Sequence, residues 1–423
     1  MTANRSGRLQ ALGPGVLYAA TAVGTSHLVH STRAGAGYGL ALVLFILLTY
    51  IAKYPAFRFG AQYASATGRS LLHGYRQQGN WAVYVYIVIA IGTMFAAVPA
   101  VTLVTAGLAK AAFDLPLGAF PISAVILGVC GTVLIIGGYP VLDRIVKVLM
   151  AVLAAATLLA TALVIPQIDW AMSASLLPAE IGPADVFFIV ALLGFMPSSV
   201  DLSVWHSLWS VAKARDSNRK ATLRDVLDDF HIGYFGTFLL ALCFVLLGTG
   251  VMHNSGVPFE SSPAGFATQL INLYQQTLGD WSGPLIGTIA VAVMFSTVLA
   301  GLDGYPRAAV SIFRMYASRE SGDEQRAAVT DKRTYALTVI VLALGSLFIL
   351  YFLVSSLQVV VDVAATIMFL FAPVVAWLNH RVMKSPAIAA DVRPARGLFA
   401  LSLAGIVWLA GFSAYFLYLR FLA

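Results

Sequence analysis

Eleven long apolar runs constrain the fold of this chain more than any other feature of its sequence. They lie near residues 13–33, 36–57, 82–112, 119–138, 144–166, 183–212, 230–253, 283–311, 334–354, 356–380 and 397–421. A helix needs about 20 apolar residues to cross the hydrocarbon core of a bilayer, and the runs match that length. Inside lipid, only helices and closed barrels satisfy their backbone N–H and C=O groups. The pattern therefore predicts an all-α polytopic membrane protein with about 11 transmembrane helices.

The charge content agrees with this prediction. Charged residues make up 11% of the chain, against about 25% in soluble proteins, and the mean hydropathy is +0.84. These values exclude a cytosolic enzyme, a disordered chain and a nucleic-acid-binding protein. We expect residues 1–423 to form a single integral membrane domain, whose partners are the lipid bilayer and a small solute or metal ion. The sequence indicates no particular oligomeric state.

The basic residues are confined to every second gap between the runs. One such gap carries Lys213, Arg215, Arg219, Lys220 and Arg224, whereas the alternate gaps carry almost no Lys or Arg. Cytoplasmic loops of membrane proteins are enriched in these two residues. The alternation therefore predicts a cytoplasmic N-terminus and an external C-terminus, in a membrane of the bacterial inner (plasma) type.

Glycine, proline and polar residues interrupt two of the runs near their middle. The run 13–33 contains GTSH at residues 24–27, and the run 183–212 contains MPS at residues 196–198. Freed backbone groups are costly where they face lipid, so such breaks persist where they line a cavity. Broken helices at corresponding positions of two halves are typical of the binding sites of transporters.

The two breaks lie five runs apart, in the first and the sixth run. Two groups of five spans, at about 13–166 and 183–380, then enter the membrane from opposite sides and form an inverted repeat. The run 397–421 is an extra helix. We expect a substrate to lie between the breaks, where unwound carbonyl groups suit a cation and half-helix N-termini suit an anion.

Several short motifs are spread along the chain. Gly-Pro at 13–14 and Tyr-Gly at 38–39 bound the first span, TGRSL at 67–71 follows the second, FDLPL at 113–117 follows the third, and Met-Pro at 196–197 lies in the sixth. In kind and order they resemble the motifs of the NRAMP family of divalent-metal transporters. The resemblance implies a LeuT-type fold with broken helices 1 and 6, and a transported divalent metal ion with no bound cofactor.

The sequence departs from that family at the residues that bind metal. With the motifs aligned, Gly24 occupies the position of the metal-binding Asp in the family's D-P-G-N motif, and His27 occupies the position of its Asn. The Met ligand of M-P-H is kept as Met196, and Ser198 replaces its His. The acidic residues that move protons on the family's third span fall on two valines, Val98 and Val101. The resemblance therefore implies the fold and transport in a divergent branch, without the family's proton coupling.

Residues around the breaks could rebuild a metal site. A hard divalent ion prefers oxygen ligands with at least one carboxylate. Asp201 is the acid nearest to either break, and with His27 and Met196 it would make a mixed site suited to Mn²⁺ or Fe²⁺. Alternatively, Asp201 caps the half-helix that follows it. The predicted substrate-binding residues are Gly24, Ser26, His27, His30, Met196, Ser198 and Asp201.

Arg33 favours a different substrate. With His27 and His30 it would attract an anion or a carboxylate on the outer half of the first span. A charge inside the membrane is costly unless it is paired or solvated. The alternative is therefore that Arg33 pairs with Asp362 or extends to the membrane surface.

Charged residues in two other runs have simpler interpretations. Asp303 and Arg307 are spaced as an i, i+4 ion pair near the cytoplasmic end of their run. They are candidates for a gate or for a structural charge pair. Lys53 is expected to form a similar pair or to extend its amine to the membrane surface.

Three functions are compatible with these observations. The first is a secondary transporter of divalent metal ions of the Mn, Fe or Mg class, which works by alternating access around the breaks. The second is a transporter of a polar organic solute or anion on the same scaffold, and the third is a membrane receptor that does not transport. An enzyme is not expected, since the sequence has no nucleophile elbow, zinc motif or P-loop.

Overall fold

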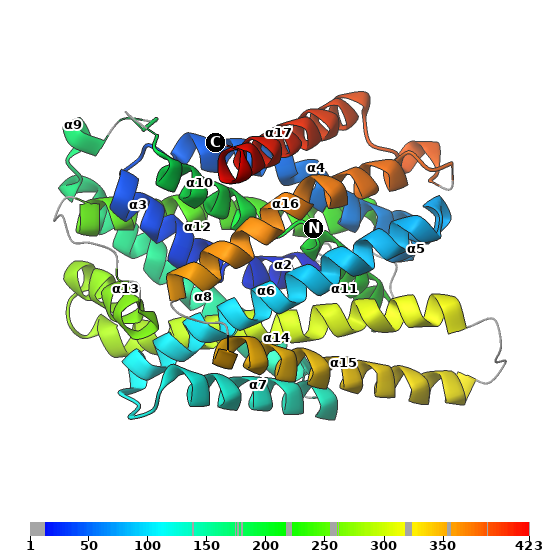
Figure 1. The fold of residues 1–423 in the computed structure, drawn as a ribbon, viewed down its shortest axis with the longest axis horizontal. Coiled ribbons are helices and arrows are strands. Elements are labelled where there is room, and N and C mark those ends of the chain that lie inside the picture. Colours follow the sequence, from blue (N-terminus) through cyan, green and yellow to red (C-terminus); the bar gives the residue numbers. More distant parts are fainter. Residues whose placement is uncertain are drawn as a thin grey trace, which may run out of the picture.

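Every regular element of the protein is a helix within the part that the structure, a computed structural model, describes. That part is residues 13–422 apart from gaps at 138, 174, 176, 179–180, 217–221, 254–259, 261, 318–323, 353–356 and 387. The long helices run roughly along the longest axis of the molecule (Figure 1). The prediction of an all-α fold is confirmed.

The helices fall into a long and a short class. The long ones are α4 (Val43–Thr67), α6 (Asn80–Phe113), α7 (Ala119–Ile136), α8 (Tyr139–Val164), α12 (Leu223–Leu247), α14 (Ser282–Ala317), α15 (Glu324–Phe352), α16 (Leu357–Met383) and α17 (Arg396–Phe421). The short ones are α2 (Pro14–Ala22), α3 (Thr32–Tyr38), α5 (Leu71–Gln78), α9 (Trp170–Ser173), α10 (Pro183–Phe195), α11 (Leu202–Asp216) and α13 (Pro263–Leu278). The remaining elements are π-helices at η1 (Ser26–Ser31) and η3 (Gly248–His253) and 3₁₀ turns at η2 (Ile165–Gln167) and η4 (Ala390–Val392).

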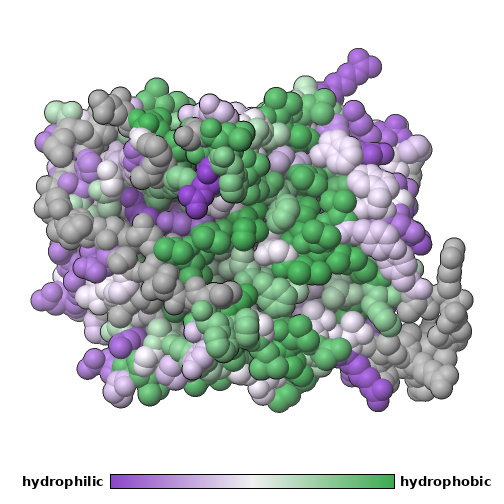
Figure 2. Space-filling model, viewed as in Figure 1, coloured by the Kyte–Doolittle hydropathy of each residue, from purple (hydrophilic) through white to green (hydrophobic). Residues whose placement is uncertain are grey.

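Nine helices in the described part of the chain are long and apolar enough to cross a membrane. Figure 2 shows the corresponding surface: apolar side chains cover much of the middle, and hydrophilic ones gather towards the two ends of the long axis. The predicted spans 13–33 and 183–212 fall outside this count because each is divided into shorter helices. The total of eleven spans therefore stays a prediction.

The first break has a well-defined form. Helix α2 ends at Ala22, the chain bends at residues 23–24, and η1 then continues directly into α3. The predicted limits of the first two spans are wrong, since α3 runs on to Tyr38 and α4 begins at Val43. The turn comes instead at Gly39, whose φ of 56° is a conformation that favours glycine.

The second break separates α10 from α11. Helix α10 ends at Phe195, and residues 196–201 form no regular helix before α11 begins at Leu202. Helix α10 packs along α16, and α11 packs along α4 and α14. The broken segment therefore lies among long helices and not on the outer surface of the bundle.

Two polar contacts fix the short helices α2 and α5 against longer ones. The carboxylate of Asp229 on α12 accepts hydrogen bonds from the backbone N–H groups of Gly13 at 3.2 Å and Gly15 at 2.6 Å, which caps the start of α2. In α5, the buried Tyr75 hydroxyl donates to Oδ1 of Asn379 on α16 at 2.5 Å. Burial raises the pKa of the Tyr75 hydroxyl, so it remains protonated as the donor. Neither α5 nor α13 was predicted as a run, because each is too short and too polar to cross a membrane.

Candidate functional site

The two breaks meet near the centre of the bundle. The Ser26 hydroxyl lies 3.4 Å from the carbonyl oxygen of Pro197, across 171 residues of sequence. It also donates to the carbonyl of Ala22 at 2.5 Å, one of the groups freed where α2 ends. The broken parts of the first and sixth predicted spans are therefore in direct contact.

A small cavity of about 50 Å³ lies at this contact. Hydroxyl groups line it from both breaks and from α14: Thr21, Thr25, Ser26, Ser198, Ser199 and Thr297. Val98 and Val101 on α6 also line it, and no charged side chain is among its described lining residues. A space of this size holds a few water molecules or one small ion. Two of the predicted substrate-binding residues, Ser26 and Ser198, thus face the cavity.

Gly24 is required for the packing of the first break against α14. A Cβ atom at this position would lie 2.8 Å from the Thr297 Cγ2 atom, closer than real contacts allow. A carboxylate at Gly24 would therefore require the Thr297 side chain or the break itself to move.

The side chain of His27 is engaged by neighbouring helices and not by the cavity. Its Nδ1 lies 2.6 Å from the Ser26 hydroxyl and 3.0 Å from the Ala22 carbonyl. Its Nε2 lies 3.1 Å from the Tyr50 hydroxyl on α4 and 2.9 Å from the Thr237 carbonyl on α12. Both ring nitrogens thus have polar partners, and a metal ion would have to displace them.

Met196 and Asp201 have separate surroundings. The Met196 sulfur lies 3.8 Å from the Ser31 hydroxyl. The Asp201 carboxylate accepts from Thr93 on α6 at 3.0 Å, from Ser199, and from Tyr305 on α14 at 3.3 Å. Among the described residues, no backbone N–H of α11 donates to this carboxylate, so the alternative in which Asp201 caps α11 gains no support.

The predicted metal ligands are therefore not brought together. His27, Met196 and Asp201 do not line the central cavity in the structure. The described residues contain no group of three or more His, Cys, Asp or Glu side chains placed to hold a metal ion. A site built from these three side chains stays a prediction that this conformation does not assemble.

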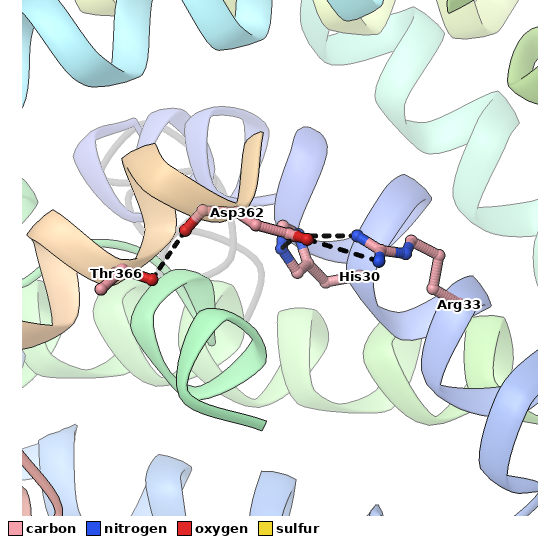
Figure 3. A network of polar contacts seen from close by, with 4 residues as sticks. All are labelled: His30, Arg33, Asp362 and Thr366. Carbon is pink, nitrogen blue, oxygen red and sulfur yellow. Dashed lines mark hydrogen bonds and ion pairs between the residues drawn. The ribbon is translucent and has the colours of Figure 1, made fainter. Parts of the chain in front are cut away.

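A charged cluster, which we term the outer closure, lies beyond the first break (Figure 3). Arg33 on α3 pairs with both carboxylate oxygens of Asp362 on α16, at 2.8 and 3.5 Å. The Nε2 atom of His30 lies 3.5 Å from the same carboxylate, and the Arg33 guanidinium lies 4.7 Å from the centre of the Phe188 ring. The alternative in which Arg33 pairs with Asp362 is the one observed.

A second polar cluster, which we term the inner closure, lies on the other side of the cavity. Asp303 on α14 pairs with Arg307 at 2.5 Å and accepts from the Tyr335 hydroxyl at 2.7 Å and the Trp209 indole at 3.2 Å. The predicted i, i+4 ion pair is thus present. Trp205 packs edge-on against Tyr305, with 4.6 Å between ring centres, and both rings line the central cavity.

A large vestibule begins at the inner closure. It has a volume of about 1120 Å³, and its lining includes Asp303, Arg307, Arg69, Arg314 and Lys332. Arg69, Arg314 and Lys332 belong to the basic gaps between the apolar runs, which the sequence predicts to be cytoplasmic. On α14, Tyr305 lines the central cavity, whereas Asp303 and Arg307 on either side of it in the sequence line the vestibule.

Lys53 on α4 is a polar group whose environment the sequence did not reveal. Its side chain is fully buried, and its amine donates to backbone carbonyl oxygens around the second break. Within the described part of the chain no acid lies within ion-pair distance of this amine, and the side chain does not extend to the surface, so both expectations for it are wrong. The signal in the sequence was a lysine in the middle of an apolar run, but its partners lie 140 or more residues away.

Comparison with known proteins supplies the family. The family model described as natural resistance-associated macrophage protein-like (Nramp) matches residues 15–419. The chain belongs to this family. An uncharacterized protein of Pasteurella multocida (strain Pm70) is 32% identical over 413 residues, which are 97% of this chain and 92% of that protein. The resemblance seen in the motifs is confirmed.

Solved structures of other proteins share the fold of this Nramp family member. The manganese transporter of Eremococcus coleocola aligns with a TM-score of 0.69 and 13% identity, over 96% of this chain and 86% of that chain. MhsT, in complex with L-phenylalanine, aligns with a TM-score of 0.60 and 15% identity, over 97% of this chain and 98% of that chain. The LeuT-type fold with two broken helices is confirmed, and the chain is an integral membrane protein of a transporter family.

Proposed function

We propose that this protein is a secondary transporter that moves a small substrate through the central cavity by alternating access. The observation that carries the proposal is the contact between Ser26 and Pro197, with a cavity lined from both breaks. Unwound backbone inside a membrane is tolerated where it lines a substrate path. The outer closure blocks this path on one side, while the vestibule approaches it on the other.

The proposed domain organisation follows from the same contact. Repeats at about 13–166 and 183–380 would each contribute one break to the cavity, and the helix at 397–421 would lie outside the repeats. Rocking one part of the repeats against the other would then open the cavity to each side in turn. Proton coupling through acids on the third span is not included, because Val98 and Val101 line the cavity where those acids would be.

The first candidate substrate is a divalent metal ion of the Mn, Fe or Mg class. Membership of the Nramp family and the shared fold of a manganese transporter support it. The cavity offers hydroxyl and carbonyl oxygens, which hard divalent ions accept as ligands. Its nearest carboxylate by sequence is Asp201, which would have to leave its three hydroxyl partners to reach the ion.

The second candidate is a small polar organic solute or an anion. The described lining of the cavity has no carboxylate, and the buried amine of Lys53 lies 3.3 Å from the carbonyl oxygen of Ser198, a lining residue. A positive charge so close to the cavity disfavours a divalent cation and favours an anionic group. MhsT, which shares the fold, binds L-phenylalanine.

Uptake by the purified protein in liposomes tests the proposal. Uptake of Mn²⁺, Mg²⁺ and Ca²⁺ is measured with and without a pH gradient, and saturable Mn²⁺ uptake is the expected result. Asp201→Asn should abolish it, whereas the control Asp185→Asn should retain it, because Asp185 lies at the start of α10 beside Tyr38. The pH gradient should have no effect on the rate, since no proton-coupling acid lines the cavity.

If the liposomes take up no divalent ion, the second candidate substrate is tested next. Absence of uptake of any divalent ion excludes the first candidate, and the same liposomes are then tested with radiolabelled amino acids and carboxylic acids. If neither class is transported while purified protein still binds one of them, transport itself is excluded and a receptor role replaces it.

A further inference from the structure

The amine of Lys53 lies inside a ring of backbone oxygens. Lys53 is in the middle of α4 and has no exposed surface. Its Nζ donates to the carbonyl of Leu193 at 2.7 Å, of Gly194 at 2.9 Å and of Met196 at 2.8 Å, and lies 3.3 Å from that of Ser198. These oxygens belong to the last turn of α10 and to the broken segment after it.

This geometry matches a charged ammonium group. An ammonium has three N–H donors and no acceptor, and the three shortest contacts use all of them. Among the described residues, no carboxylate oxygen lies within 4.0 Å of the Lys53 amine. The groups in direct contact with the positive charge are therefore carbonyl dipoles, which are concentrated at the C-terminal end of a helix, while Asp201 acts on it from a greater distance.

The same oxygens would suit a free cation. Carbonyl groups freed at the end of a half-helix are the ligands with which broken transporter helices hold alkali cations. Without a donor, these buried carbonyls would remain unsatisfied, which is costly. A cation is thus needed at this point, whether it comes from solution or from the chain.

We propose that the carbonyl oxygens of residues 193–198 form a cation-binding site, and that the Lys53 ammonium fills it as a tethered substitute for a free ion. The site holds the two half-helices α10 and α11 in their broken arrangement. On the further premise that the protein is a transporter, its cycle needs no Na⁺ or K⁺ at the second break.

Removing the tethered cation should create a site for a free one. In Lys53→Ala, the vacated space matches propylammonium, which replaces the three outer carbons and the amine of the lost side chain. The melting temperature of the purified variant is expected to fall below that of the wild type. It should rise again in a saturable way with propylammonium, and to a smaller extent with K⁺ or Na⁺, relative to N-methylglucamine at equal ionic strength.

Two controls separate charge from packing. The wild type and Lys332→Ala, whose lysine is exposed in the vestibule, should show no such saturable rise. Lys53→Met keeps most of the side-chain volume but lacks the charge, so it should be destabilised and not be restored by propylammonium.

Two results would overturn the proposal. One is a Lys53→Met variant as stable as the wild type, because the carbonyls would then need no cation. The other is a Lys53→Ala variant that no small cation stabilises, including the case in which it fails to fold in every cation solution. The melting temperature requires no knowledge of the transported solute, so these outcomes stand apart from success or failure of the uptake experiments.

Discussion

The outer and inner closures lie on opposite sides of the central cavity and are built differently. The outer one depends on an ion pair between Arg33 on α3 and Asp362 on α16, two elements that no short loop connects. The inner one depends on Asp303 and Arg307, which share the helix α14. Figure 1 shows that α3 lies towards one end of the molecule and the C-terminal part of α14 towards the other.

The two arginines differ in exposure to solvent in the same sense, although the carboxylates do not. Arg33 is 8% exposed, whereas Arg307 is 36% exposed and faces the vestibule; Asp362 is 29% exposed and Asp303 1%. A charge with little access to water depends on its partner far more than one that water can solvate. The outer closure must therefore break when α3 and α16 separate, whereas the inner ion pair can move with α14 as one unit.

Loss of the ion pair in the outer closure should destabilise the protein the most. Asp362→Ala leaves Arg33 nearly buried without its carboxylate, which should lower the free energy of unfolding by about 3 kcal/mol. Transport should also be lost, because the closed outer state is no longer stabilised. Denaturation in detergent measures the first effect, and uptake by liposomes measures the second.

A charge exchange provides the control for this experiment. The double variant Arg33→Asp with Asp362→Arg should regain part of the lost stability, since it restores an ion pair between α3 and α16. A single variant Asp362→Ala that unfolds like the wild type would contradict the difference we draw between the two closures.

The inner closure should respond more weakly. Asp303→Asn removes the charge but keeps the shape, and Arg307 can turn into the vestibule to be solvated. Loss of charge-assisted hydrogen bonds to Tyr335 and Trp209 should cost about 2 kcal/mol. Tyr335→Phe, which removes one of these bonds, should cost about half as much. If Asp303→Asn proves more damaging than Asp362→Ala in the same denaturation assay, the ranking of the closures is reversed.

Much of the fold could be predicted because the membrane imposes strong local rules. The spans could be predicted from the length of the apolar runs. The breaks could be predicted from Gly, Pro and Ser at positions where backbone groups without hydrogen-bond partners cannot face lipid. The predicted end of the first span at Arg33 is wrong. The charge of Arg33 is neutralised by Asp362, 329 residues away, so the helix continues to Tyr38.

Side-chain directions at the site could not be predicted in the same way. The π-helical turn of η1 changes the residue spacing after Ser26, so a regular helix gives no reliable direction for His27. The ring instead finds partners on α4 and α12. The ring of carbonyls around Lys53 could not be predicted from local sequence patterns, because it forms only where the second break packs against α4.

Chemical labelling can distinguish the two closures by their access to solvent. Ser311 lines the vestibule, whereas Thr32, at the start of α3 beside the outer closure, is 1% exposed. Ser311→Cys should therefore react with a membrane-impermeant thiol reagent from the cytoplasmic side, and Thr32→Cys should react from neither side. The native Cys130 and Cys243 are buried, so the wild type should give a low background.

Combining two variants gives this labelling experiment its control. If Asp362→Ala opens the outer closure, adding it to Thr32→Cys should make the cysteine reactive from the external side. Labelling of Ser311→Cys from the external side would instead show that the predicted orientation of the chain is wrong.

The smallest effect is expected at the mouth of the vestibule, where Arg314 on α14 pairs with Asp331 on α15. Arg314 is 51% exposed, so water can replace its partner. Asp331→Ala should lower the free energy of unfolding by less than about 1 kcal/mol, and by less still at high salt, which screens exposed pairs. The effect of Asp362→Ala should change little with salt, because Arg33 is nearly buried. Measuring both variants at low and high ionic strength therefore tests whether burial, and not the number of ion pairs, decides which cluster holds the protein closed.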